Sequence, residues 1–172
     1  MSEYTISKVY PSDKRAISQI KGLLEKEGIT LDANLDYICG MYDADYNIIA
    51  TGSCFGATLR CFAVDKGHQG EGLLNKVVTH LTEIQFSRGN SHLFLCPKPT
   101  AAPLFADLGF YEIARVEGTL VFMENRRSGF SDYLARLARH RIDGKSAALV
   151  MNANPFTRGH QYVAERASEG CE

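Results

Sequence analysis

The chain has 172 residues, of which 45% are hydrophobic and 23% are charged, a balance typical of a folded globular protein and not of a disordered one. Its 19 basic and 20 acidic residues leave a net charge of −1, which gives no reason to expect the basic surface of a nucleic-acid-binding protein. The apolar runs are short and no basic N-terminal region precedes an apolar one, so we expect no membrane span, no signal peptide and a cytoplasmic location.

Strand-like and helix-like segments alternate along the first 125 residues in an order typical of a mixed α/β domain. Strands are expected where apolar residues alternate or run together between turn residues: 4–9, 36–42, 47–55, 59–64, 92–96, 111–116 and 119–123. Helices are expected where apolar residues recur at helical spacing: 11–26, 72–88 and 101–108. The three consecutive strands at 36–64 predict an antiparallel meander, and the last two strands predict a hairpin around Glu117-Gly118.

The remaining residues have a different organisation. An amphipathic, basic helix is expected at 131–140, and an apolar run at 147–150 predicts a buried strand that leads through a turn into a helix. A strand, a tight turn and a helix start are how a nucleotide-binding domain begins. Such a domain needs further strands, yet the chain stops at Glu172, so we expect a truncated second domain. The predicted domains are 1–125, a helical linker at 126–144, and 145–172.

The cysteines predict neither a disulfide framework nor a metal centre. Their number is odd, no Cys-x-x-Cys pair occurs, and no histidine lies at a spacing that suggests a ligand or a catalytic partner. We therefore expect free, mostly buried thiols in a reducing compartment and no metal ligands. The five are Cys39, Cys54, Cys61, Cys96 and Cys171.

A glycine-rich loop after the fourth predicted strand is the first candidate site. Residues 65–72 contain three glycines and open the long helix, with Gln69, Gly70, Glu71 and Gly72 at its start. Unpaired backbone N–H groups and the positive end of the helix dipole favour an anion at such a position. A plain strand-to-helix turn is the alternative interpretation.

The order of elements together with two motifs resembles the GNAT acyltransferase fold, which binds acyl-CoA. That family's central motif is Gln or Arg, two residues, Gly, one residue, then Gly or Ala; Gln69 and Gly72 match it, whereas Leu74 departs from it. Residues 104–110, ending in Leu-Gly-Phe, look like the second motif. The resemblance covers about residues 3–125. It implies a mixed, mainly antiparallel sheet flanked by helices.

The same resemblance implies roles for particular residues. Gln69, Gly70, Glu71 and Gly72 would hold the pyrophosphate of a CoA-like arm. Phe62 and Val64, on the strand before the loop, would pair with its pantetheine.

Phe105 departs from the chemistry of many GNAT enzymes. In them, the residue five before the final Phe of the second motif is a tyrosine that protonates the departing thiolate, and here Phe105 has no proton to give. Tyr111 is either a substitute acid or a packed strand aromatic. Neither Asp65 nor Glu71 is positioned by sequence as a general base.

Residues 151–160, Met-Asn-Ala-Asn-Pro-Phe-Thr-Arg-Gly-His, are the second candidate site. They resemble the signature of the nucleotidyltransferase superfamily, which transfers a nucleotide from a nucleoside triphosphate and releases pyrophosphate. Negative charge that develops on the phosphates needs preorganised donors, and His160 and the Thr157 hydroxyl can provide them, while Gly159 lets the chain come close. A capped turn with a surface histidine is the alternative.

The pairing of the two motifs resembles the citrate (pro-3S)-lyase ligase family. This resemblance implies an acid–thiol ligase that activates acetate with ATP and passes the acetyl group to a thiol arm, phosphoribosyl-dephospho-CoA, on the acyl-carrier subunit of citrate lyase. It implies that His160 and Thr157 are catalytic and that ATP, with Mg²⁺, binds at Asn154, Pro155, Phe156 and Gly159. By itself, the chain is expected to bind the CoA-derived arm without making acetyl-AMP.

Two other functions remain open at this point. A stand-alone GNAT enzyme would acetylate an amine from acetyl-CoA. A non-catalytic module would bind a CoA-like arm or its carrier protein without turnover.

Overall fold

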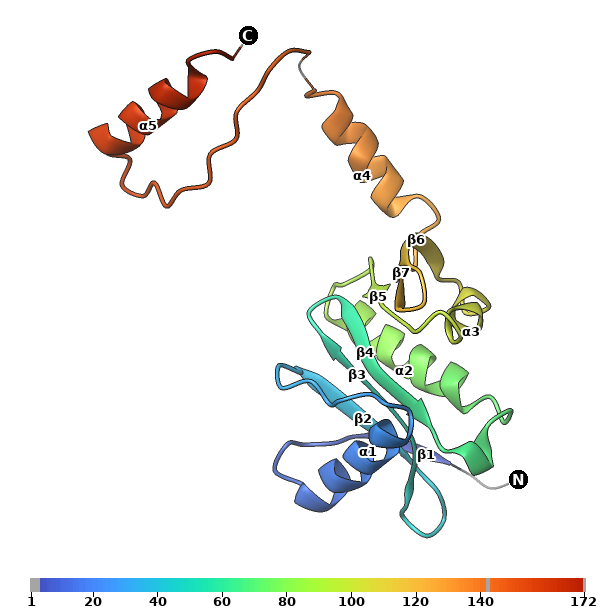
Figure 1. The fold of residues 1–172 in the computed structure, drawn as a ribbon. Coiled ribbons are helices and arrows are strands. Elements are labelled where there is room, and N and C mark those ends of the chain that lie inside the picture. The colour runs from blue at the N-terminus through green and yellow to red at the C-terminus, as the bar shows by residue number, and fades with distance from the viewer. Residues whose placement is uncertain (1–3, 142, 172) are drawn as a thin grey trace. The chain divides into compact units, whose positions relative to one another are not determined.

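The computed structural model describes residues 4–141 and 143–171 (Figure 1). The chain divides into two compact units, Met1–Phe130 and Ser131–Glu172, and each is described by itself. The functional assignment of the three predicted domains stays a prediction.

The first unit is built on a seven-stranded sheet in the order β1-β2-β3-β4-β5-β7-β6. All neighbouring strands are antiparallel except β4 and β5, which are parallel. The mixed, mainly antiparallel α/β fold predicted from the sequence is therefore confirmed. The strands are β1 (Thr5–Lys8), β2 (Tyr37–Tyr42), β3 (Ile48–Phe55), β4 (Thr58–Val64), β5 (Phe94–Leu95), β6 (Tyr111–Val116) and β7 (Leu120–Glu124).

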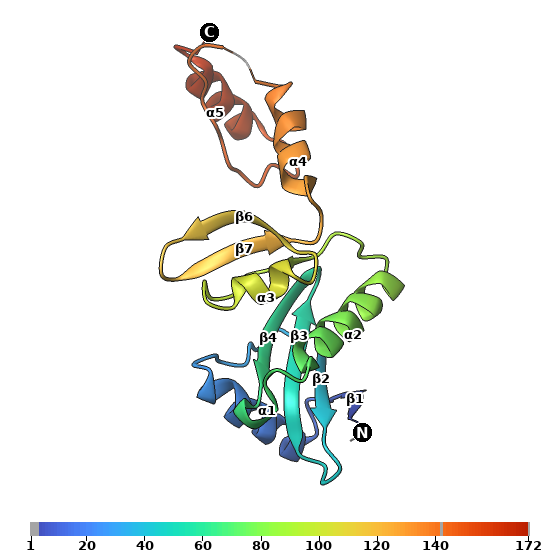
Figure 2. The ribbon, with the colours of Figure 1, turned by 90° about the vertical axis from the view of Figure 1, so that its right-hand side faces the viewer.

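Helices cover both faces of this sheet (Figures 1 and 2). They are α1 (Lys14–Lys26), α2 (Leu73–Ser87) and α3 (Ala102–Ala106), with a 3-10 turn at Lys66–His68. Because side chains alternate between the faces of a strand, β2 places Ile38 against the α1 side and Cys39 against the α2 side. The two apolar clusters fix α1 and α2 on opposite faces of the sheet.

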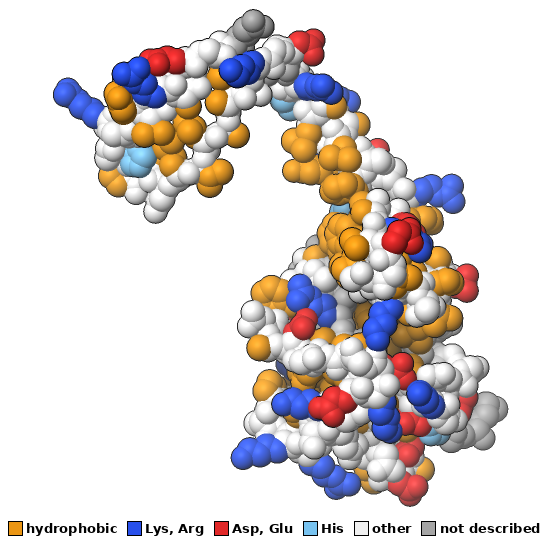
Figure 3. Space-filling model, viewed as in Figure 1, with side chains coloured by type: hydrophobic (Ala, Val, Ile, Leu, Met, Phe, Trp, Pro, Cys, Tyr) orange, Lys and Arg blue, Asp and Glu red, His pale blue; other side chains and the backbone are white. Residues whose placement is uncertain are grey.

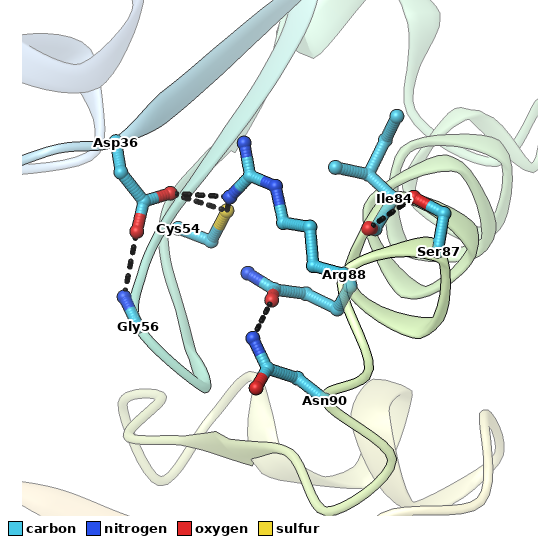
Figure 4. A network of polar contacts seen from close by, with 8 residues as sticks. Asp36, Cys54, Gly56, Ile84, Ser87, Arg88 and Asn90 are labelled. Carbon is cyan, nitrogen blue, oxygen red and sulfur yellow. Dashed lines mark hydrogen bonds and ion pairs between the residues drawn. The ribbon is translucent and has the colours of Figure 1, made fainter.

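The C-terminal end of α2 is tied to the sheet by a polar network (Figure 4). Arg88 donates to the Asp36 carboxylate at 2.7 Å, and the same carboxylate accepts the Gly56 amide at 2.8 Å. Burial by itself raises the pKa of Asp36, but the hydrogen bonds from Arg88 and Gly56 outweigh it and lower that pKa. Nearby, burial raises the pKa of the Cys54 thiol to about 11, so this thiol stays protonated.

The two remaining helices of the described residues are α4 (Gly129–Ala138), which begins in the last two residues of the first unit, and α5 (Arg158–Ser168). Hydrophobic side chains gather along one flank of α4 (Figure 3). Among the side chains of this helix, Leu134 and Leu137 are about half exposed. No helix among the described residues is both long enough and apolar enough to cross a bilayer.

The strand predicted at residues 147–150 is absent from the structure. These described residues are irregular and exposed, and Val150 is fully accessible. A strand persists only when a neighbour pairs with its backbone, and the described residues of Ser131–Glu172 include no other strand. An apolar run predicts that a segment is buried, but it does not provide the neighbouring strand with which its backbone would pair.

Candidate functional site

The sheet opens between β4 and β5. The two strands pair only at Thr58 with Phe94 and at Leu59 with Leu95. Beyond Leu95 the chain stays with β7, because the Val121 amide donates to the Pro97 carbonyl at 2.9 Å. Meanwhile β4 remains paired with β3 as far as Val64, so the two neighbours part and one edge of β4 has no strand beside it among the described residues (Figure 2).

A bulge in β4 marks the place where the strands part. The register with β3 shifts between Thr51 and Ser53, and Cys61 has a φ of 51°, which is unusual for a residue with a side chain. Because of the bulge, both Arg60 and Cys61 reach toward the α1 side of the sheet. The sequence contained no signal for this bulge, because a cysteine in a left-handed conformation has no characteristic pattern.

The backbone of Phe62 and Val64 faces the open edge of β4. The Asp65 amide donates to the Ile49 carbonyl on β3 at 2.8 Å. In an antiparallel ladder the polar groups of successive residues point to alternate sides, so those of Phe62 and Val64 point away from β3. These two residues can therefore pair with an extended, amide-containing ligand. Their assignment to such a ligand stays a prediction.

Aromatic side chains line the α2 face beside this edge. The Phe62 ring contacts the Phe105 ring in an edge-on arrangement, with 5.2 Å between centroids. Phe105 is only 4% exposed, and its phenyl ring also lies against Phe110. A buried phenyl group thus occupies the position where many GNAT enzymes carry an acidic tyrosine.

Tyr111 lies elsewhere in the sheet. It begins β6, the edge strand, which β7 separates from β5, so two strand spacings of about 5 Å each lie between β6 and β5. The guanidinium of Arg127 lies over its ring at 5.7 Å. Tyr111 is also 39% exposed, so it is not a packed aromatic, and its place on the edge strand disfavours a substitute acid at the β4 edge.

The glycine loop leads from β4 into α2. Gly70 has a φ of 87° and Gly72, the N-cap of α2, has a φ of 75°, while a Cβ atom on either would meet nothing within 4 Å. Backbone conformation therefore accounts for both glycines. No side chain caps the start of α2, which leaves its first amides for an anion.

The carboxylate of Glu71, within this loop, is held in place by hydrogen bonds. Glu71 accepts from the Tyr4 hydroxyl at 2.6 Å and lies 3.2 Å from His68 Nδ1. The bond from Tyr4, followed by that from His68, lowers the pKa of Glu71. An ionised carboxylate repels phosphate, so Glu71 can assist a pyrophosphate through its backbone but not through its side chain. Gln69 is exposed in the same loop.

The second motif forms a capped helix start at α5. The Thr157 hydroxyl faces the His160 amide at 3.5 Å, and His160 Nδ1 accepts the Thr157 amide at 3.0 Å. This reciprocal capping corresponds to the capped turn that the sequence left open as the alternative interpretation of the motif. It also fixes the orientation of the His160 ring. Because Nδ1 accepts a hydrogen bond, the neutral imidazole carries its proton on Nε2 and can donate it outward.

The rest of the motif precedes α5 as an exposed turn. Asn154 and Pro155 are joined by a cis peptide bond, and Phe156 lies with its ring centroid 5.7 Å from that of His160. Gly159 lies in the first turn of α5. In the described part of the chain, no cluster of histidine, cysteine, aspartate or glutamate is arranged to hold a metal ion.

The first unit matches solved acetyltransferases in fold. An acetyltransferase of the GNAT family from Staphylococcus aureus superposes with a TM-score of 0.58 at 16% identity, covering 71% of this chain and 98% of that chain. The ribosomal-protein-S18-alanine N-acetyltransferase of Escherichia coli gives a TM-score of 0.54 at 20% identity, covering 71% and 92%. At these identities the likeness establishes the fold alone, and the protein is of the GNAT fold class.

Sequence comparison identifies relatives of this chain within the proteins of that fold. The chain is 37% identical over 161 residues to a citrate (pro-3S)-lyase ligase of Klebsiella pneumoniae and 30% identical over 167 residues to that of Escherichia coli K12. These alignments cover 93% and 96% of this chain but 47% of each relative, so the chain spans about half the length of the curated relatives it matches. Residues 146–172 match the profile of the citrate lyase ligase C-terminal domain. The chain is thus a relative of the citrate lyase ligases, as its two motifs predicted.

Proposed function

We propose that this chain supplies the arm-binding part of a citrate (pro-3S)-lyase ligase that works in the cytoplasm. In this reaction acetate attacks the α-phosphate of ATP, which gives acetyl-AMP and releases pyrophosphate. The thiol of a CoA-derived arm, phosphoribosyl-dephospho-CoA on the acyl-carrier subunit of citrate lyase, then attacks the acetyl carbon, and AMP leaves. The observation that carries the proposal is the open edge of β4 with its glycine loop, in a chain related to these ligases.

The arm would lie along β4. Its pyrophosphate would accept hydrogen bonds from the amides of Gln69, Gly70, Glu71 and Gly72 and from the first turn of α2. Its pantetheine amides would pair with the outward backbone groups of Phe62 and Val64, as an added strand does at a sheet edge. Phe105 is consistent with this role, because a thiol that attacks acetyl-AMP needs no acid to protonate a departing sulfur.

ATP would bind at the second motif. His160 would donate from Nε2 to the phosphates, and the turn at Asn154, Pro155 and Phe156 with Gly159 would bring backbone close to them. Thr157 would contribute chiefly by holding the His160 ring, since its hydroxyl lies 2.9 Å from Nδ1. Mg²⁺ would neutralise phosphate charge when bound.

An N-acetyltransferase is the second candidate, because the solved neighbours in fold include such enzymes. It would transfer acetyl from acetyl-CoA to an amine and needs an acid for the departing thiolate. The phenyl group of Phe105 at the usual position of that acid disfavours it.

An assay with the full-length ligase tests the proposal. The protein is mixed with ATP, acetate and the deacetylated carrier subunit, and AMP, pyrophosphate and acetyl-carrier are measured. We expect the three products in equal amounts, and a loss of about 100-fold or more in rate for His160→Ala. Acetyl transfer from acetyl-CoA to amines, with no pyrophosphate formed from ATP, would instead establish the second candidate.

A further inference from the structure

The segment between α1 and β2, residues 27–36, forms a strap over the place where β4 and β5 part. Arg60 donates to Asp32 of the strap at 3.0 Å. The Cys61 thiol points to the Thr30 carbonyl at 3.8 Å, and Lys98, just after β5, donates to the Glu27 carbonyl. The strap is therefore attached to β4 and to the segment that follows β5.

Apolar packing holds the underside of the strap. Ile29, Leu31 and Leu35 are partly buried against the cluster that α1 forms with the sheet, and Cys61 belongs to the same cluster. Asp36, at the end of the strap, is fixed by the Gly56 amide. Apolar contacts below and polar contacts at the rim make this an ordered part of the fold.

The strap lies where the end of a bound arm would lie. With its pyrophosphate at the start of α2, an arm that follows β4 back from Val64 to Arg60 covers about 13 Å, at about 3.3 Å per residue. Its thiol then lies near Arg60 and Cys96, the residues that follow the last paired positions of β4 and β5. Cys96 is exposed as a residue, against the expectation of a buried thiol, but partial burial of its sulfur raises its pKa, so this neighbouring thiol stays protonated at neutral pH.

We propose that the strap closes the α1 side of the opening, so that the domain stores the arm with its thiol or acetyl thioester shielded from acceptors. Arg60 and Lys98 are the residues that hold it closed. This inference rests on the proposed arm binding and adds a specificity: the site takes a pantetheine thioester and excludes an attacking amine. Acetylation of the arm then takes place after its end leaves this site.

Hydroxylamine attack on bound acetyl-CoA tests the strap. The amine nitrogen attacks the acetyl carbon, the carbon–sulfur bond breaks, and acetohydroxamate and free CoA form. The rate is measured with the protein in excess over acetyl-CoA, for the wild-type chain, Arg60→Ala/Lys98→Ala and a control, Arg15→Ala/Lys21→Ala. The control removes the same two types of charge from exposed positions of α1.

We expect the wild type and the control to slow the reaction about tenfold or more relative to free acetyl-CoA, because the strap excludes the nucleophile. Arg60→Ala/Lys98→Ala should bring the rate to within about threefold of free acetyl-CoA with little change in affinity. Asp32→Asn, which leaves the fold's apolar contacts intact, should give an intermediate rate.

The outcomes distinguish a failure of the proposed arm site from a failure of the proposed strap. No binding of acetyl-CoA overturns the proposed arm site itself. Binding without protection overturns the strap alone, and so does protection that persists in Arg60→Ala/Lys98→Ala.

Discussion

Single residues decide how the glycine loop is shaped. Gly72→Ala puts a side chain at a φ of 75° with no clash, so its cost is conformational, about 1–2 kcal/mol. Gly22, inside α1, also has space for a methyl group but has no positive φ, and Gly22→Ala should stabilise the fold by about 0.5–1 kcal/mol. Urea denaturation of the two variants checks the contrast, and equal effects would contradict it.

Gly129, at the start of α4, is constrained by packing. A Cβ atom there would lie 2.5 Å from Glu124 Oε2 and 2.7 Å from His92 Nε2, two side chains that contact each other. Glu124 also accepts the Phe130 amide at 2.9 Å, so it holds the beginning of the helix. We expect Gly129→Ala to destabilise the fold by about 1–3 kcal/mol, measured by urea denaturation. Stability within error of the wild type would show that the pair shifts freely.

The substitution Phe105→Tyr tests whether the missing hydroxyl is the only reason why this domain would not transfer acetyl groups to amines. Phe105→Tyr adds an oxygen to a ring packed against Phe62 and Phe110, which should cost about 1–3 kcal/mol. We expect no acetyl transfer from acetyl-CoA to amines by this variant, because the strap still excludes the acceptor. Turnover above the wild type in an amine-acetylation assay would contradict the account.

At the scale of elements, the Asp36–Arg88 contact fixes the end of α2. We expect Asp36→Asn to cost about 1 kcal/mol at neutral pH, at the low end for a charged hydrogen bond because both side chains are more than a third exposed. The pKa of Asp36 is lowered by folding, so its contribution is complete above about pH 5 and is lost as the pH falls below about 4.

Denaturation at several pH values checks this dependence, with Asp45→Asn, an exposed turn position, as the control. The difference between Asp36→Asn and the wild type should shrink in acid. A difference that stays constant down to pH 3 would show that the lost contact is not electrostatic.

The sequence predicted most elements because each carries its own local signal. The apolar spacing of α1 and α2 and the turn residues between β2, β3 and β4 placed these elements within a few residues. The strand expected at 147–150 failed because pairing depends on a neighbouring strand, which a local pattern cannot specify. The bulge at Cys61 and the contacts of Lys98 with the strap also depend on tertiary structure, so they could not be predicted from the local sequence. The loop at Gln69–Gly72 and the positions of Phe62, Val64 and Phe105 were visible beforehand through the family resemblance.

At the scale of the whole molecule, the two motifs belong to separate compact units, Met1–Phe130 and Ser131–Glu172. The relatives are about twice as long as this chain, and we expect the remainder of their length to complete the nucleotide site. Residues 1–172 should therefore release no pyrophosphate from ATP and acetate, in an assay where the full-length ligase does. Measurable pyrophosphate release by this chain would contradict that expectation.

Calorimetric titration of the chain with CoA tests the central claim, that the opened edge of β4 and the glycine loop hold a CoA-like arm. The account predicts binding at one site, competition by inorganic pyrophosphate, weaker binding by Gly72→Ala and unchanged binding by Gly22→Ala. Absence of binding, or equal affinity of the two glycine variants, would contradict it.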